Sequence, residues 1–67
     1  MSKIVLYSKE HCPMCKQLET ELTRRNISFE KDTDINKMIA MGIKNVPMLS
    51  VDGHLMGLAE AMKYLKD

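Results

Sequence analysis

Apolar residues along the chain fall into short runs whose spacing changes between that of a strand and that of a helix. Residues 4–7 are apolar or aromatic throughout, which predicts a central strand covered on both faces. Residues 13–25 predict a helix, and its inner face carries side chains at helical spacing: Cys15, Leu18 and Leu22. Residues 27–30 alternate apolar and polar, which predicts a half-buried second strand before a polar connection at residues 31–33.

The second half of the chain shows the same change of spacing. Residues 34–41 predict a short helix capped by Asp34, with three residues expected to point inward: Ile35, Met38 and Ile39. Residues 48–51 predict a third strand, and Asp52-Gly53 predicts a tight hairpin to a returning strand at residues 54–56. A final helix follows with an apolar inner stripe: Leu58, Ala61, Met62 and Leu65.

The predicted element order is β-α-β-α-β-β-α. The first two strands flank a helix and should be parallel by the crossover rule, whereas the last two should form an antiparallel hairpin. We therefore expect an α/β fold, a four-stranded mixed sheet with three helices, as a single domain over residues 1–67.

Charge and hydropathy exclude several classes of function. The formal net charge is +1 and neither sign dominates any stretch, so no nucleic-acid patch or charged membrane surface is predicted. The longest apolar run near the N-terminus has four residues, which is too short for a signal-peptide core or a membrane span. We expect a cytoplasmic monomer that binds neither nucleic acid nor membranes.

The only two cysteines of the chain, Cys12 and Cys15, lie at the junction between the first strand and the first helix. Pro13 suits the first helical turn, which places Cys12 at the N-cap, with the free N–H groups of Met14 and Cys15 directed towards its sulfur. These donors and the positive end of the helix dipole favour a thiolate. In a reducing compartment such a pair is seldom a structural crosslink. Placement and spacing together predict a redox dithiol.

The expected chemistry is thiol–disulfide exchange, with Cys12 as the nucleophile and Cys15 as the resolving thiol. The alternative is a pair of unreactive cysteines in a small core. Lys9 and His11 lie close enough in sequence to stabilise a Cys12 thiolate, and for each the alternative is a solvated loop residue. Met14 is expected to contact substrate, whereas the other methionines are expected mostly in the core or in loops.

Residues 7–15, Tyr-Ser-Lys-Glu-His-Cys-Pro-Met-Cys, resemble the Tyr-Ser-Lys-x-x-Cys-Pro-Tyr-Cys segment of the glutaredoxins. Val46-Pro47 is similar to their Thr-Val-Pro, and residues 51–53 are similar to the hairpin that follows. The resemblance spans nearly the whole chain and implies a minimal thioredoxin fold with thiol–disulfide oxidoreductase activity. It also implies that Pro47 is cis and forms the opposite wall of the site, and that the Val46 N–H and C=O pair with an extended substrate.

The chain departs from the family pattern at two positions and in one segment. Met14 replaces an aromatic residue, and Asn45 replaces the Thr before Val46-Pro47. Glutaredoxins carry Gly-Gly-x-(Ser/Thr)-Asp after the last strand, where it holds the γ-glutamyl end of glutathione; residues 57–61 of this chain read Gly-Leu-Ala-Glu-Ala, with Glu60 as the substitute for the Asp. A single Gly followed by a bulky apolar residue is more similar to the small redoxins that feed ribonucleotide reductase and are recharged by thioredoxin reductase.

The resemblance also implies the partners and the substrate groove. We expect a disulfide-bearing protein substrate, with ribonucleotide reductase as one candidate, and either glutathione or thioredoxin reductase as the electron source, without a bound cofactor. The expected substrate-binding residues are Lys9, His11, Pro13, Met14, Val46, Pro47, Gly57, Leu58 and Glu60.

Metal binding is the alternative of a different class. Small copper chaperones also carry Cys-x-x-Cys after a first strand, but they end in a strand and have no Pro between the cysteines. Two cysteines cannot complete a tetrahedral zinc site within one chain. A zinc ion or a cluster shared between two subunits stays an alternative, because some glutaredoxins bind an iron–sulfur cluster between protomers, but Pro13 disfavours it.

Overall fold

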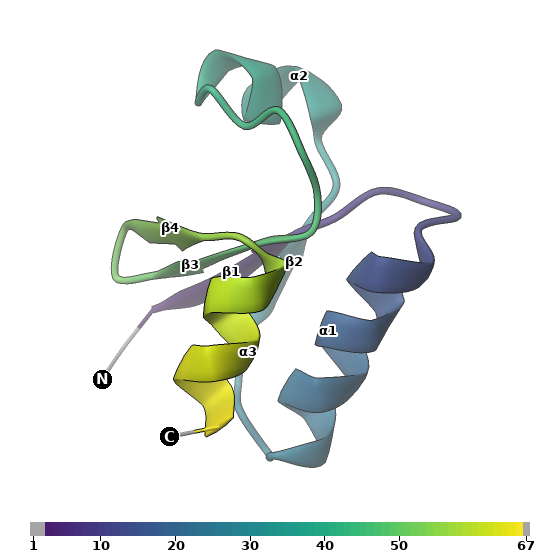
Figure 1. Cartoon of the computed structure of the whole chain (residues 1–67). Helices are drawn as coiled ribbons and strands as arrows, with labels where there is room; N and C mark the ends of the chain where they lie inside the picture. Colours follow the sequence, from purple (N-terminus) through teal and green to yellow (C-terminus); the bar gives the residue numbers. More distant parts are fainter. Residues whose placement is uncertain (1–2, 67) are drawn as a thin grey trace.

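The computed structural model describes residues 3–66. Strands and helices follow one another in the predicted order: β1 (Ile4–Tyr7), α1 (Pro13–Arg24), β2 (Glu30–Asp32), α2 (Ile35–Ala40), β3 (Met48–Val51), β4 (His54–Met56) and α3 (Leu58–Lys66). The strands form one sheet in the order β2-β1-β3-β4 (Figure 1). β1 pairs parallel to β2 and antiparallel to β3, and β3 and β4 form the antiparallel hairpin. The predicted α/β fold with a mixed sheet is confirmed.

The second strand differs from the prediction. β2 covers Glu30–Asp32, whereas the alternating pattern predicted residues 27–30 and a polar connection after them. Ile27 and Phe29 pack against the core from the segment that leads into the strand, so their alternation reflects side-chain packing rather than strand pairing. The residues that pair with β1 are polar. This is tolerated because β2 is an edge strand, and charged side chains at an edge disfavour pairing with another chain.

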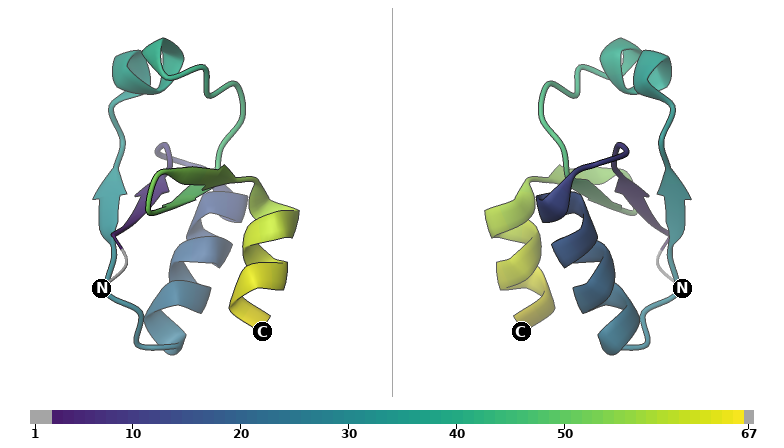
Figure 2. Two further views of the ribbon diagram at one scale, coloured as in Figure 1. Left: turned by 90° about the vertical axis from the view of Figure 1, so that its left-hand side faces the viewer. Right: turned by 90° about the vertical axis from the view of Figure 1, so that its right-hand side faces the viewer.

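Helices α1 and α3 lie side by side on one face of the sheet, as both views of Figure 2 show. Between them and the sheet lies a core of seven buried residues: Leu6, Leu18, Leu22, Leu49, Met56, Ala61 and Leu65. Leu58 and Met62 of α3 pack at its border, as the predicted inner stripe requires. We call this side of the sheet the α1/α3 face.

Helix α2 lies on the opposite side of the sheet (Figure 1), which we call the α2 face. Its smaller core consists of Val5, Tyr7, Met38 and Ile43. The prediction that three residues of α2 point inward is right only for Met38, which is 2% exposed. Ile35 and Ile39 are 46% and 66% exposed. With six residues the helix has fewer than two turns, so it presents little more than one side chain to the sheet.

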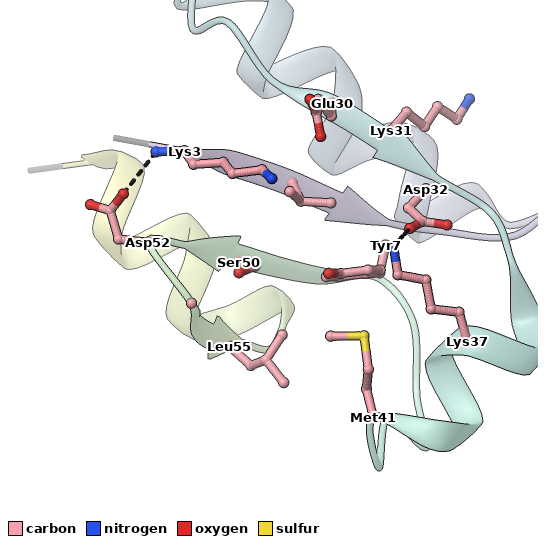
Figure 3. Close-up of a pocket in the computed structure, with 12 residues that line it drawn as sticks. Lys3, Tyr7, Glu30, Lys31, Asp32, Lys37, Met41, Ser50, Asp52 and Leu55 are labelled. Carbon is pink, nitrogen blue, oxygen red and sulfur yellow. Dashed lines mark hydrogen bonds and ion pairs between the residues drawn. The ribbon is translucent and has the colours of Figure 1, made fainter. Parts of the chain in front are cut away.

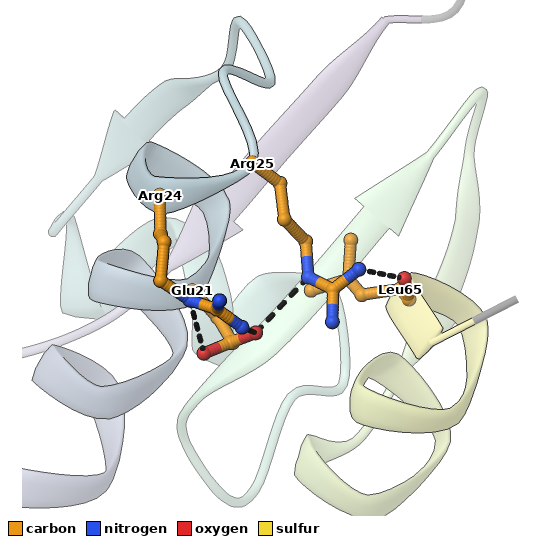
Figure 4. Close-up of polar contacts among 4 residues, drawn as sticks. All are labelled: Glu21, Arg24, Arg25 and Leu65. Carbon is orange, nitrogen blue, oxygen red and sulfur yellow. Dashed lines mark hydrogen bonds and ion pairs between the residues drawn. The ribbon is translucent and has the colours of Figure 1, made fainter.

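Polar contacts fix the ends of the helices. Asp34 caps α2 as predicted, since its Oδ1 accepts the Lys37 N–H at 3.1 Å. At the C-terminal end of α1, the Arg25 guanidinium donates to Glu21 at 3.0 Å and also to the carbonyl oxygen of Leu65 in α3 (Figure 4). Arg25 therefore ties the two helices together at their C-terminal ends. Within residues 3–66 no helix is long and apolar enough to span a membrane.

Candidate active site

Cys12 occupies the N-cap of α1, as the sequence predicted. Its backbone is extended, with φ −115° and ψ 101°, and Pro13 is the first helical residue. The Cys15 N–H donates to the Cys12 Sγ at 3.2 Å, so the sulfur takes the place that a Ser or Asp oxygen takes at an ordinary N-cap. Within residues 3–66 the Met14 N–H makes no such bond, so one of the two predicted donors is found. A hydrogen bond from the backbone and the helix dipole both favour negative charge on this sulfur.

The two sulfurs differ in accessibility. A disulfide joins Cys12 to Cys15, whose Cα atoms are 5.2 Å apart. Cys12 is half-buried, whereas Cys15 is 3% exposed and faces the core side of α1. An external reactant therefore reaches Cys12 first, and Cys15 is placed to react only with its neighbour.

The loop before Cys12 turns sharply. His11 has φ +57°, a left-handed conformation that reverses the chain between β1 and the N-cap. His11 and Lys9 are both exposed, and within residues 3–66 neither side chain makes a hydrogen bond or an ion pair. Both lie within three positions of Cys12 in the sequence, but the structure assigns them no contact with its sulfur.

Val46 and Pro47 lie next to this loop. The register pairs Tyr7 with Met48, so the segment leading into β3 runs alongside the end of β1, where the loop to Cys12 begins. The Val46–Pro47 peptide bond is cis, which confirms what the family resemblance implied. Within residues 3–66 the Val46 N–H and C=O make no backbone hydrogen bond.

Ser8, the first residue of the loop after β1, is hydrogen-bonded to β2. The Ser8 N–H donates to the Asp32 carbonyl oxygen at 3.0 Å, which extends the parallel pairing by one residue. The Asp32 carboxylate accepts the Asp34 N–H at 2.9 Å and pairs with the Lys37 ammonium at 2.9 Å. These two contacts hold the pKa of Asp32 below its ordinary value. The Ser8 Oγ is buried without a hydrogen-bond partner within the described residues.

Gly57, Leu58 and Glu60 lie at the N-terminal end of α3, beside the end of α1 that begins at Pro13 (Figure 2), but within residues 3–66 none of them forms a hydrogen bond or ion pair with Cys12 or Cys15. Gly57 precedes α3, and its carbonyl oxygen accepts the Ala61 N–H at 2.8 Å. Leu58 packs against the α1/α3 core. The Glu60 Oε2 lies 3.1 Å from the Nε2 of His54 in β4. Residue spacing alone does not indicate this pair, because the two residues come from different elements, β4 and α3.

Two grooves lie on the α2 face. A larger one of about 390 Å³ is lined by Tyr7 and Leu55 and by charged side chains that include Lys3, Glu30 and Lys37 (Figure 3). Neither cysteine lines it. The smaller groove, of about 290 Å³, lies between α2, the loop before Cys12 and the segment before Pro47, and its lining includes Lys9 and Val46. Lys9 and Val46, both predicted to bind substrate, therefore line the same groove.

The described residues offer little to a metal ion. Within residues 3–66 no group of three or more His, Cys, Asp or Glu side chains is placed to hold one. The two sulfurs that a shared site would use are bonded to each other in this structure.

Comparisons with known proteins agree with the geometry of the fold. A solved structure of glutaredoxin 1 from Francisella tularensis, complexed with cacodylate, superposes with a TM-score of 0.72 at 21% sequence identity, and the match covers all of both chains. A protein named NaGST1, in an orthorhombic crystal form, superposes with a TM-score of 0.74 at 18% identity over 97% of this chain. This chain spans only 34% of the length of the NaGST1 chain. No curated protein matches.

A family model gives the more specific result. The model described as Glutaredoxin matches residues 4–56, well over half of the chain, and this range includes both cysteines and Val46-Pro47. The chain belongs to the glutaredoxin family, whose general chemistry is thiol–disulfide exchange.

Proposed function

We propose that this protein is a dithiol oxidoreductase that reduces protein disulfides or glutathione mixed disulfides through Cys12 and Cys15. The placement of the pair carries the proposal: the Cys12 sulfur accepts a backbone N–H at the N-cap of α1, and Cys15 lies buried one turn along. A sulfur stabilised as an anion at a helix N-terminus is the nucleophile that disulfide exchange requires.

The mechanism starts from the reduced pair. The Cys12 thiolate attacks one sulfur of the substrate disulfide, a new S–S bond joins Cys12 to the substrate, and the other substrate sulfur leaves as a thiolate that takes a proton from water. Cys15 then loses its proton and attacks the Cys12 sulfur. This step forms the Cys12–Cys15 disulfide and releases the second substrate thiolate. Two electrons pass from the dithiol to the substrate.

Several groups support substrate binding beside the dithiol; Lys9, His11 and Met14 are exposed, Val46 is half-buried and Pro47 is buried. The unpaired N–H and C=O of Val46 suit an extended backbone, as in the addition of a strand, with Pro47 as the adjoining wall. Met14 is 51% exposed directly after Pro13 and offers an apolar contact next to Cys12. Lys9 and His11 add donors on the loop before it. The proposal takes the protein as a monomer, since one chain supplies both cysteines.

The electron donor has two candidates, and the packing of residues 57–60 favours the second. Glutathione would need this segment to hold its γ-glutamyl end, but Leu58 packs against the core and Glu60 pairs with His54. These contacts support a small redoxin that is recharged by thioredoxin reductase and feeds ribonucleotide reductase.

Serine variants test the roles of the cysteines. Cys12→Ser should abolish both disulfide reduction and mixed-disulfide formation, and Cys15→Ser should accumulate the mixed disulfide, which mass spectrometry detects. Tyr64→Ser, at an exposed site on α3, is the matched control and should react like the unaltered protein. If Cys12→Ser still reduces disulfides while Cys15→Ser does not, the assigned roles are reversed.

Two reducing systems test the donor. The oxidised protein is mixed with glutathione and its reductase, or with thioredoxin reductase, and NADPH consumption is followed in each. Turnover with thioredoxin reductase alone supports the small-redoxin candidate, and turnover with glutathione contradicts it. If neither system reduces the protein, and the protein reduced beforehand does not react with disulfides, the shared-metal alternative becomes the better explanation.

A further inference from the structure

The groove of about 290 Å³ beside Val46 combines a buried apolar floor with an exposed apolar wall. Met38 and Ile43 form the floor and belong to the α2 core. The wall comes from Ile35 and Ile39, one helical turn apart on α2 and 46% and 66% exposed. These two isoleucines contribute little to the core, so their apolar surface is available for a partner.

Charges at this groove have one sign. Lys9 and Lys44 line it together with Asn45, and no carboxylate does within the described residues. Neither lysine forms an ion pair within residues 3–66, whereas Lys31 and Lys37 both do. An acidic group would therefore find two unpaired cations next to an apolar surface. The groove continues to Val46, whose backbone is free to pair with a substrate chain.

We propose that this groove selects the protein substrate: it binds an apolar side chain close in sequence to the substrate cysteine, while Lys9 and Lys44 pair with acidic residues of the same segment. This inference rests on the proposed oxidoreductase function and names its substrate class, a disulfide-bearing acidic and apolar polypeptide. The volume lies just below the usual range for small-molecule sites, about 300–1,000 Å³. It accommodates one large apolar side chain.

The test uses the full chain, reduced beforehand and freed of reductant, so that no electron donor is involved. Three synthetic peptides each carry one cysteine as a mixed disulfide with 2-mercaptoethanol. The first has a leucine near the cysteine and glutamates on either side. The second has serine in place of the leucine, and the third has lysines in place of the glutamates. Bis(2-hydroxyethyl) disulfide is the reference that lacks side chains. Loss of protein thiols is followed by alkylation and mass spectrometry.

The unaltered protein should react about tenfold faster with the leucine peptide than with the serine peptide, the discrimination that one apolar contact gives. Ile39→Ser should reduce this ratio to about twofold or less. Tyr64→Ser, which also removes an exposed apolar side chain but lies on α3, should leave the ratio unchanged. Lys44→Glu should reverse the preference between the glutamate and lysine peptides, and Lys63→Glu on α3 should not.

Three results would overturn the proposal. The first is equal rates for the leucine and serine peptides with the unaltered protein. The second is an equal loss of the ratio in Ile39→Ser and Tyr64→Ser. The third result uses glutathione disulfide as an additional substrate: the unaltered protein reacts faster with it than with every peptide, and Ile39→Ser abolishes this preference. The groove would then bind the tripeptide. Failure of the proposed function is recognised separately, since the reduced protein would then not react with the reference disulfide either.

Discussion

The two faces of the sheet are covered unequally. On the α1/α3 face, two helices enclose a core in which Leu6, Leu18, Leu22 and Leu49 are completely inaccessible. On the α2 face, a helix of six residues packs through Met38, and the two grooves described above lie beside it. Cys12 and Cys15 lie at the N-terminal end of α1, on the well-packed face. The smaller groove, which adjoins the loop before Cys12, lies on the α2 face. We infer that stability is concentrated on one face and recognition on the other.

The largest expected effect comes from a cavity on the well-packed face. Leu22→Ala should lower the free energy of unfolding by about 2–5 kcal/mol, because the void lies among residues that cannot close around it. Met38→Ala should cost about 2 kcal/mol, at the low end of that range, because its void can open into the adjoining groove. Urea unfolding followed by circular dichroism measures both. Equal losses would show that the faces contribute alike.

A smaller effect is expected at the cap of α2. Asp34→Ala removes the acceptor of the Lys37 N–H and should cost about 1 kcal/mol. Because α2 stands apart from the main core, the loss should appear as faster amide exchange within Ile35–Ala40 rather than throughout the chain. Thr33→Ala, at an exposed neighbouring site, is the control and should change neither quantity. Uniformly faster exchange would mean that α2 unfolds together with the sheet.

The tie between α1 and α3 should matter less, since it lies at the surface. Arg25→Gln removes the donors to Glu21 and to the Leu65 carbonyl and should cost about 0.5–1 kcal/mol. Arg24→Gln is the matched comparison, because within residues 3–66 Arg24 bonds only to Glu21, in the same helix (Figure 4), and its cost should be smaller. If Arg24→Gln lowers the free energy of unfolding more than Arg25→Gln does, the contact between Arg25 and α3 does not stabilise the fold.

The smallest effect is the dependence of stability on pH. The Asp34 N–H and the Lys37 ammonium lower the pKa of Asp32, and Arg24 and Arg25 lower that of Glu21. A carboxyl whose pKa is lower in the folded state stabilises the fold above its unfolded-state pKa, and this contribution is lost as the pH falls through the folded-state pKa. The urea midpoint should therefore fall as the pH drops below about 4.

Variants of single carboxyl groups show how much each face contributes to the fall of the urea midpoint in acid. Asp32→Asn removes the contribution that lies at the groove of the α2 face, and Glu21→Gln removes the one on α1. Each should make the urea midpoint depend less on pH in the acidic range. The reasoning is wrong if the unaltered protein becomes more stable on acidification.

The sequence predicted best where local chemistry and packing agree. Cys12 and Asp34 are N-caps because each precedes a helical pattern with an acceptor atom, and both are found as predicted. Leu18 and Leu22 are buried because α1 is long enough to present a whole face to the sheet. Ile35 and Ile39 have the same helical spacing but lie on a helix too short to bury them. Periodicity shows which residues share a face, not whether another element covers it.

Other features depended on tertiary structure that the pattern does not contain. The apolar residues Ile27 and Phe29 could not indicate that pairing begins at Glu30, because the register with Val5 is set by the whole sheet. The pair between His54 and Glu60 required the hairpin and α3 to meet. The smaller groove could not be predicted for the same reason, because Ile35 and Ile39, which form its wall, have the spacing of buried residues.

The burial of Cys15 also determines how the pair withstands peroxides. An oxidant that reaches the more accessible Cys12 would convert its thiolate to a sulfenic acid, the first and reversible step of sulfur oxidation. Cys15, one helical turn away and shielded from the same oxidant, can condense with it, so that water leaves and the disulfide forms. This reaction diverts Cys12 from the irreversible sulfinic and sulfonic acids. The buried Cys15 thus keeps Cys12 in oxidation states that a thiol reductant can reverse.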